Sequence, residues 1–205
     1  YEGNGVKSEF TVFSKATYRI NDKWSVFGDL QGRFLNYKTL GITSDLVPLN
    51  VDENYSFFNP KAGLTYKLNP SNQFYFSYGK AHREPSRNDY EQGIVTPEKL
   101  DDFELGWRFA SEKVKVNTNI YYMNYKDQLV LSGELNDVGA PLRTNSGKSY
   151  RLGLEVDAEI QLLKNLRTLP NIALSTNKNV DFVTSRVGIF ANKEIAIRFP
   201  FKIPG

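Results

Sequence analysis

Apolar and polar side chains alternate along much of this chain, most clearly between Ser149 and Leu162. In that segment every second residue from Tyr150 onward is apolar, and the residues between are mostly Arg, Glu, Asp and Gln. Because successive side chains of a strand point to opposite sides, one face suits hydrocarbon and the other suits water. The same alternation covers 58–68 and 102–110, and looser versions cover 10–20, 24–34, 74–78, 114–125 and 166–174.

Short polar turns and much longer connections follow one another along the chain. The short ones are 21–23, 69–72, 111–113 and 164–165, and the long ones are 38–56, 83–98 and 133–148. In outer-membrane barrels the short turns face the periplasm and the long loops face outward. The pattern predicts an all-β fold, an antiparallel transmembrane β-barrel of which about eight or nine strands are present.

Composition agrees with a barrel that spans a membrane with strands. The chain has 205 residues, a mean hydropathy of -0.46 and no long apolar run that would form a transmembrane helix. Aromatic residues make up 14% of the chain, and such residues form girdles at the bilayer interfaces of barrels. Positive and negative residues are mixed along the chain, which has a net charge of +3 and no basic stripe. This distribution argues against nucleic acid as a partner.

No pattern of residues supports a catalytic, cofactor or metal site. Cys is absent and His82 is the single histidine, so neither a thiolate site nor a histidine cluster can be built from the sequence. There is no nucleophile motif of the GxSxG type, and no glycine-rich phosphate loop opens a helix. We expect no enzyme activity.

Six segments, in order along the chain, resemble motifs of TonB-dependent outer-membrane receptors of the iron-complex type. They are FNPKAGLTY at 58–66, QFYFSYGKA at 73–81, HREPSRNDY at 82–90, PEKLDDFELG at 97–106, NIYYMNYKDQL at 119–129 and SYRLGLE at 149–155. The resemblance implies that residues 1–205 are part of the receptor's β-barrel domain. It also implies that the plug domain and the TonB box lie outside this chain.

The resemblance further implies a function and a set of partners. Such receptors are energy-coupled transporters in the outer membrane of Gram-negative bacteria, with a barrel of roughly 22 strands closed by an N-terminal plug. The implied partners are a ferric siderophore or other large chelate, the protein's own plug domain, the TonB complex and outer-membrane lipid.

Five residues are candidates for contact with the ligand. Arg83, Glu84 and Arg87 lie in the segment that resembles the receptor rim, where they could bind an anionic ferric chelate. Mutual ion pairs that hold the loop are the interpretation favoured by the alternating charges. Tyr121 and Tyr125 fall on the predicted lumen face, where their rings could stack on planar groups of a chelate or pack against the wall.

Two other functional classes stay open at this stage. A passive porin-like barrel would share the alternating strands but would need no plug. A soluble β-sandwich binding module also has alternating strands, and it would bury its apolar faces against each other.

Overall fold

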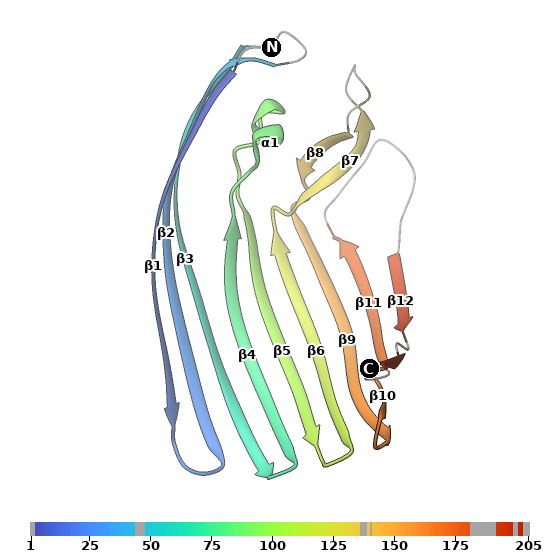
Figure 1. The fold of residues 1–205 in the computed structure, drawn as a ribbon. Coiled ribbons are helices and arrows are strands. Elements are labelled where there is room, and N and C mark those ends of the chain that lie inside the picture. The colour runs from blue at the N-terminus through green and yellow to red at the C-terminus, as the bar shows by residue number, and fades with distance from the viewer. Residues whose placement is uncertain are drawn as a thin grey trace.

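The computed structural model describes residues 3–43, 48–135, 139, 141–180, 192–198 and 201–202. They form one curved antiparallel sheet of long strands, with the short turns at one end and the longer connections at the other (Figure 1). The long strands are β1 (Gly3–Arg19), β2 (Trp24–Ile42), β3 (Pro48–Asn69), β4 (Asn72–Arg83), β5 (Glu98–Ala110), β6 (Val114–Lys126), β9 (Lys148–Leu163) and β11 (Asn171–Asn179). The all-β antiparallel fold predicted from the sequence is confirmed.

Neighbouring strands in the sequence pair with each other from β1 to β6, and β6 then pairs with β9. Polar side chains close the short turns at the predicted places. Asn21 Oδ1 accepts hydrogen bonds from the amides of Lys23 and Trp24, and Asn69 Oδ1 accepts one from the amide of Ser71. These side chains satisfy turn amides that the sheet leaves unpaired.

The strand register separates an apolar face from a polar face. On one face of β2 to β6, large apolar side chains remain between 36% and 58% exposed. They are Leu30, Phe34, Phe58, Leu64, Phe74, Phe76, Phe103, Leu105, Ile120 and Tyr122. A continuous apolar surface of this kind marks contact with lipid or protein. We call it the outer face, and the opposite, polar side the lumen face.

The prediction that segment 38–56 forms a long loop is wrong. β2 runs to Ile42 and β3 begins at Pro48, and the two strands stay paired up to Ile42 opposite Pro48. Residues 44–47 lie outside the described part of the chain. On the lumen face of this stretch Leu49 and Tyr55 are buried, whereas the outer face carries Asp52 and Asn54. The apolar-outward alternation of a bilayer strand is therefore lost although the pairing continues.

The other two long connections contain structure of their own. Segment 83–98 holds the short helix α1 (Arg87–Glu91), and segment 133–148 holds the end of β7 (Leu129–Leu135) and all of β8 (Pro141–Asn145). β7 and β8 pair into a separate two-stranded sheet beside α1 (Figure 1). Among the described residues no helix is long and apolar enough to cross a membrane.

The last predicted strand, 166–174, is divided in two. Segment 166–174 becomes β10 (Leu166–Thr168) and the start of β11. Pro170 lies at the break, and proline has no amide proton to donate to a strand neighbour, which accounts for the interruption. β12 (Asn192–Arg198) pairs with β11, and β13 (Phe201–Lys202) pairs with β10.

Candidate functional site

The lumen face at the loop end of the sheet gathers the polar and aromatic side chains that could meet a ligand. Of the five predicted residues, Arg83 ends β4, Glu84 and Arg87 lie in the connection that follows it, and two lie on β6. α1 packs against the lumen side of β2 and β3, where Tyr90 joins a buried cluster with Leu35, Tyr55 and Phe57. The connection between β4 and β5 therefore forms part of the inner wall.

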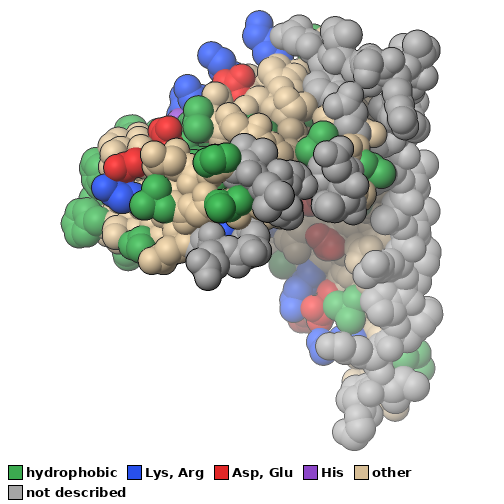
Figure 2. Space-filling model, turned by 90° about the horizontal axis from the view of Figure 1, so that it is seen from above, with side chains coloured by type: hydrophobic (Ala, Val, Ile, Leu, Met, Phe, Trp, Pro, Cys, Tyr) green, Lys and Arg blue, Asp and Glu red, His purple; other side chains and the backbone are tan. Residues whose placement is uncertain are grey.

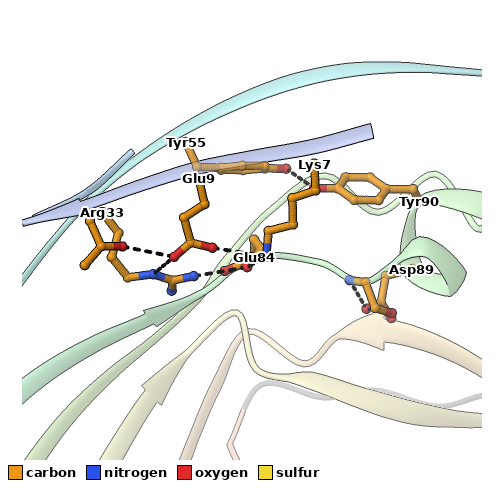
Figure 3. A network of polar contacts seen from close by, with 9 residues as sticks. Lys7, Glu9, Arg33, Tyr55, Glu84, Asp89 and Tyr90 are labelled. Atoms are coloured by element: carbon orange, nitrogen blue, oxygen red, sulfur yellow. Dashed lines mark hydrogen bonds and ion pairs between the residues drawn. The ribbon is translucent and has the colours of Figure 1, made fainter. Parts of the chain in front are cut away.

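Glu84 is the centre of an ion-pair network that joins this connection to β1 and β2 (Figure 3). Lys7 Nζ donates a hydrogen bond to Glu84 Oε1 over 2.6 Å, and Arg33 Nη2 donates to the same oxygen over 3.2 Å. Arg33 Nε also donates to Glu9 Oε1 over 2.9 Å. Residues 77 positions apart are thereby held together.

The carboxyl group of Glu84 titrates below its ordinary range. Burial alone would raise the pKa of Glu84, but the hydrogen bond from Lys7 and the charge of Arg33 outweigh it and lower this pKa. The Glu84 side chain is 15% exposed, so water screens the network less than it would at an open surface. Glu84 is thus ionised and paired at neutral pH.

Tyrosine contacts fix α1 to the wall. The Tyr90 ring stacks on Tyr37 of β2, with 4.6 Å between centroids and 15° between planes. Tyr90 also donates a hydrogen bond to the hydroxyl of Tyr55 over 3.2 Å, and Tyr55 donates to the carbonyl of Val95 over 2.7 Å. Burial, together with the contact to Tyr55, raises the pKa of Tyr90, which keeps its hydroxyl neutral.

Asp89 links α1 to the β7–β8 hairpin. Its Oδ2 accepts hydrogen bonds from the amide and the hydroxyl of Ser86, both over 2.7 Å, which caps the helix. Its Oδ1 makes no hydrogen bond and lies 3.5 Å from Nη1 of Arg143 on β8. The carboxylate is 1% exposed, so a cation beside it offsets part of the cost of burying its charge.

The predicted arginines are also engaged in ion pairs. Arg83 Nη2 donates to Glu98 Oε2 over 3.0 Å, and the same oxygen accepts a hydrogen bond from the amide of Leu129. Arg87 Nε donates to Glu91 Oε1 over 3.0 Å, one helical turn away. The Arg83 side chain is 53% exposed. Mutual ion pairing, one of the two interpretations of these charges, is therefore present, and contact with a ligand stays a prediction.

Tyr121 and Tyr125 share the lumen face with Glu104 and Gly153, as the alternation predicted. Tyr121 is 8% exposed because its ring covers Gly153. Tyr125 is more accessible and borders a polar hollow of about 160 Å³. The hollow is lined by Tyr125, Gln128, Ser149, Tyr150, Arg151, Asn177, Lys178 and Asn179. Of the two predicted tyrosines, Tyr125 is the more accessible, and contact with a ligand stays a prediction for both.

Other residues that complete this region were not predicted from the sequence. Lys7, Arg33, Tyr37, Tyr55 and Tyr90 come from three separate strands and a helix, and no motif connects them. His82 stacks on Phe57 and its Nδ1 lies 2.7 Å from Asn59 Oδ1. In the described part of the chain no group of three or more His, Cys, Asp or Glu side chains could hold a metal ion.

The comparisons with known proteins agree with this geometry. Residues 1–195 match the family profile described as TonB dependent receptor-like, beta-barrel. The copper transporter OprC superposes with a TM-score of 0.73 at 19% identity, over 85% of this chain and 29% of that one. The siderophore receptor PiuA from Acinetobacter baumannii gives 0.72 at 14% identity, over 93% of this chain and 28% of that one.

The alcaligin outer-membrane receptor FauA from Bordetella pertussis superposes with a TM-score of 0.70 at 16% identity, over 99% of this chain and 36% of that one. No curated protein matches the sequence. The chain spans about three tenths of the solved receptors that it resembles. The family profile covers nearly the whole chain, and the register supplies the lipid and lumen faces that a barrel needs. This chain belongs to the TonB-dependent receptor β-barrel family of the Gram-negative outer membrane.

Proposed function

We propose that the chain is part of the barrel of a TonB-dependent receptor that takes up a ferric siderophore or a similar large iron chelate. The observation that carries the proposal is the loop end of the lumen face, where cations and aromatic rings gather. Arg83 is 53% exposed there while paired with Glu98, and Arg151 and Tyr125 both line the polar hollow. Anionic chelates bind cations and offer flat groups for stacking.

The donor set of the chain supports a chelate over a bare metal ion as cargo. The copper transporter and the siderophore receptors are similar in fold, so the fold does not distinguish these cargoes. A bare copper ion is held by nitrogen and sulfur ligands, and this chain has one His, one Met and no Cys. A siderophore brings its own iron ligands and requires only charge and shape from the protein.

The proposal extends to partners outside this chain. A plug domain would lie against the polar lumen face, where Glu104 and Arg108 of β5 and Glu155 of β9 point inward. The TonB complex would supply the energy for opening a path through the barrel. The family match favours this energy-coupled receptor over a passive porin, and it leaves the soluble sandwich module without support.

Uptake by cells tests the proposal. Cells that carry the full-length gene, a gene deletion, or the gene without TonB are given radiolabelled ferric siderophores. We expect accumulation in the first strain and loss in the other two. Uptake that continues without TonB would point to a passive pore. Uptake that is unchanged by the gene deletion would refute the iron-chelate assignment.

A matched pair of variants tests the lumen rim itself. Arg83→Gln removes a cation from the lumen face, whereas Lys38→Gln removes one from the outer face of β2, where Lys38 pairs with Asp52 over 2.9 Å. Each variant removes one cation whose side chain is more than half exposed, 53% for Arg83 and 57% for Lys38. We expect weaker binding of the ferric chelate only with Arg83→Gln. Equal binding in both variants would remove Arg83 from the site.

A further inference from the structure

Three lysines stand side by side on the outer face at the loop end of the sheet. Lys99 of β5 lies opposite Lys126 of β6, and Lys126 lies opposite Lys148 of β9. We call these three residues the lysine row. Directly opposed side chains of antiparallel strands have Cβ atoms about 4.5–5.5 Å apart. Basic side chains are visible along one edge of the loop end in Figure 2.

The lysine row lies immediately beyond the lipid-facing surface. Along β5 its face continues through Asp101 to Phe103 and Leu105, and along β6 it continues through Asn124 to Tyr122. Tyr122 packs against Tyr150 with ring centroids 5.9 Å apart. Tyrosines of this kind mark the level of the lipid headgroups. The three ammonium groups are thus placed where headgroups of the outward-facing leaflet begin.

No carboxylate in the described part of the chain pairs with the lysine row. Asp101, the acidic residue two positions from Lys99 on this face, accepts a hydrogen bond from Tyr78 over 2.6 Å and lies 3.8 Å from Lys80 Nζ. Like charges placed directly opposite each other destabilise a sheet. The lysine row therefore carries three neighbouring positive charges without a carboxylate to offset them.

We propose that the lysine row binds the phosphate groups of a glycolipid in the outward-facing leaflet. Phosphates would offset the repulsion between the three cations, and basic clusters beside a membrane attract anionic headgroups. The row extends over two strand spacings, roughly 10 Å, which fits a headgroup with two phosphates. Leu105, Ile120 and Leu152 continue below it as an exposed apolar surface for the acyl chains. This site is separate from ligand uptake.

Lipid binding to the full-length protein tests the site. The protein is stripped of lipid in a neutral detergent and mixed with bis-phosphorylated lipid A, with its dephosphorylated form, or with inorganic phosphate. Native mass spectrometry then counts bound lipid. We expect the variant Lys99→Gln/Lys126→Gln/Lys148→Gln to bind bis-phosphorylated lipid A roughly 100-fold more weakly, since each lysine near a surface contributes about fivefold.

Two controls isolate the role of charge at this position. The variant Lys23→Gln/Lys113→Gln/Lys164→Gln removes three lysines from the short turns at the opposite end, and it should bind like the unaltered protein. Replacing the lysine row with three arginines keeps the charge and should keep binding. Unchanged binding in the first variant, equal binding of the dephosphorylated lipid, loss of binding with arginine, or competition by inorganic phosphate at the same phosphate concentration would each overturn the proposal.

Discussion

The ring of Tyr75 lies across Gly106 on the lumen face of the neighbouring strand. A Cβ atom at Gly106 would come within 2.1 Å of the ring. The ring has little freedom to move, because its hydroxyl donates to Asn119 Oδ1 over 3.0 Å and the guanidinium of Arg108 lies 4.5 Å from its centroid. The same arrangement recurs with Phe27 over Gly63 and with Tyr121 over Gly153.

Gly106→Ala should therefore destabilise the barrel, since the added methyl group displaces a ring that is held on two sides. Overpacking of this kind costs about 1–3 kcal/mol. Gly28→Ala is the matched control, because an added Cβ there meets nothing within 4 Å. Urea unfolding of the full-length protein in detergent, followed by heat-modifiable gel mobility, would compare them. Equal stability of the two variants would show that the ring over Gly106 moves freely.

A cation placed on the outer face should impair membrane assembly. Leu105 is 53% exposed on that face, and Arg near the bilayer midplane of a barrel costs roughly 2–4 kcal/mol. Leu105→Arg should reduce the amount of heat-modifiable protein in the outer membrane. Glu155→Arg introduces the same side chain on the lumen face and should have a mild effect. Similar losses from both variants would contradict the assignment of the faces.

The contact between Glu84 and β1–β2 should weaken in acid. Its lowered pKa means that the folded state favours the ionised carboxylate, so this stabilisation is present above the ordinary pKa of 4.5 and is lost as the pH falls through the lower folded value. Hydrogen exchange of the amides in 85–95 should be faster in Glu84→Gln than in the unaltered protein at neutral pH. The difference in exchange rate between the two proteins should narrow below pH 4.5. A difference in exchange rate that does not change with pH would contradict the ion-pair assignment.

Two substitutions of Tyr90 separate its hydrogen bond from its packing. Tyr90→Phe keeps the ring on Tyr37 and loses only the bond to Tyr55, which contributes about 0.5–1.5 kcal/mol. Tyr90→Ala also leaves a cavity, at a cost of about 3–5 kcal/mol. Limited proteolysis within 85–95 should show a small increase for the first variant and a large one for the second. If both resist cleavage like the unaltered protein, α1 is held by other contacts.

The strands within the bilayer were predictable because lipid imposes a strict alternation on them. Leu105 and Leu154 were assigned to the outer face, and Glu104 and Glu155 to the lumen face, and the register agrees. The extensions of β2 and β3 were missed because Leu49 and Tyr55 are buried on the lumen face there while Asp52 and Asn54 lie on the outer face, which breaks the expected alternation. Short sequence motifs indicated the family, which the alternation of apolar and polar residues alone would not have identified.

The contacts between distant segments could not be predicted from the sequence. Lys7 and Glu84 meet because the connection after β4 folds onto the wall, and nothing in the composition indicates that path. The lysine row is a similar case, since Lys99, Lys126 and Lys148 are widely separated along a chain that shows no basic stripe. Only the register brings their charges together.

Both the transport proposal and the lipid site require that one face of the sheet meets lipid and the other meets water. Spin labels placed singly at 102–109 of β5 in the reconstituted full-length protein would measure this directly, through their accessibility to oxygen and to a water-soluble nickel chelate. Position 106 is left unlabelled because the Tyr75 ring covers it. We predict a period of two residues, with oxygen reaching labels at 103, 105 and 107 and not labels at 102, 104 and 108. A profile without that period, or with the two faces exchanged, would contradict the account.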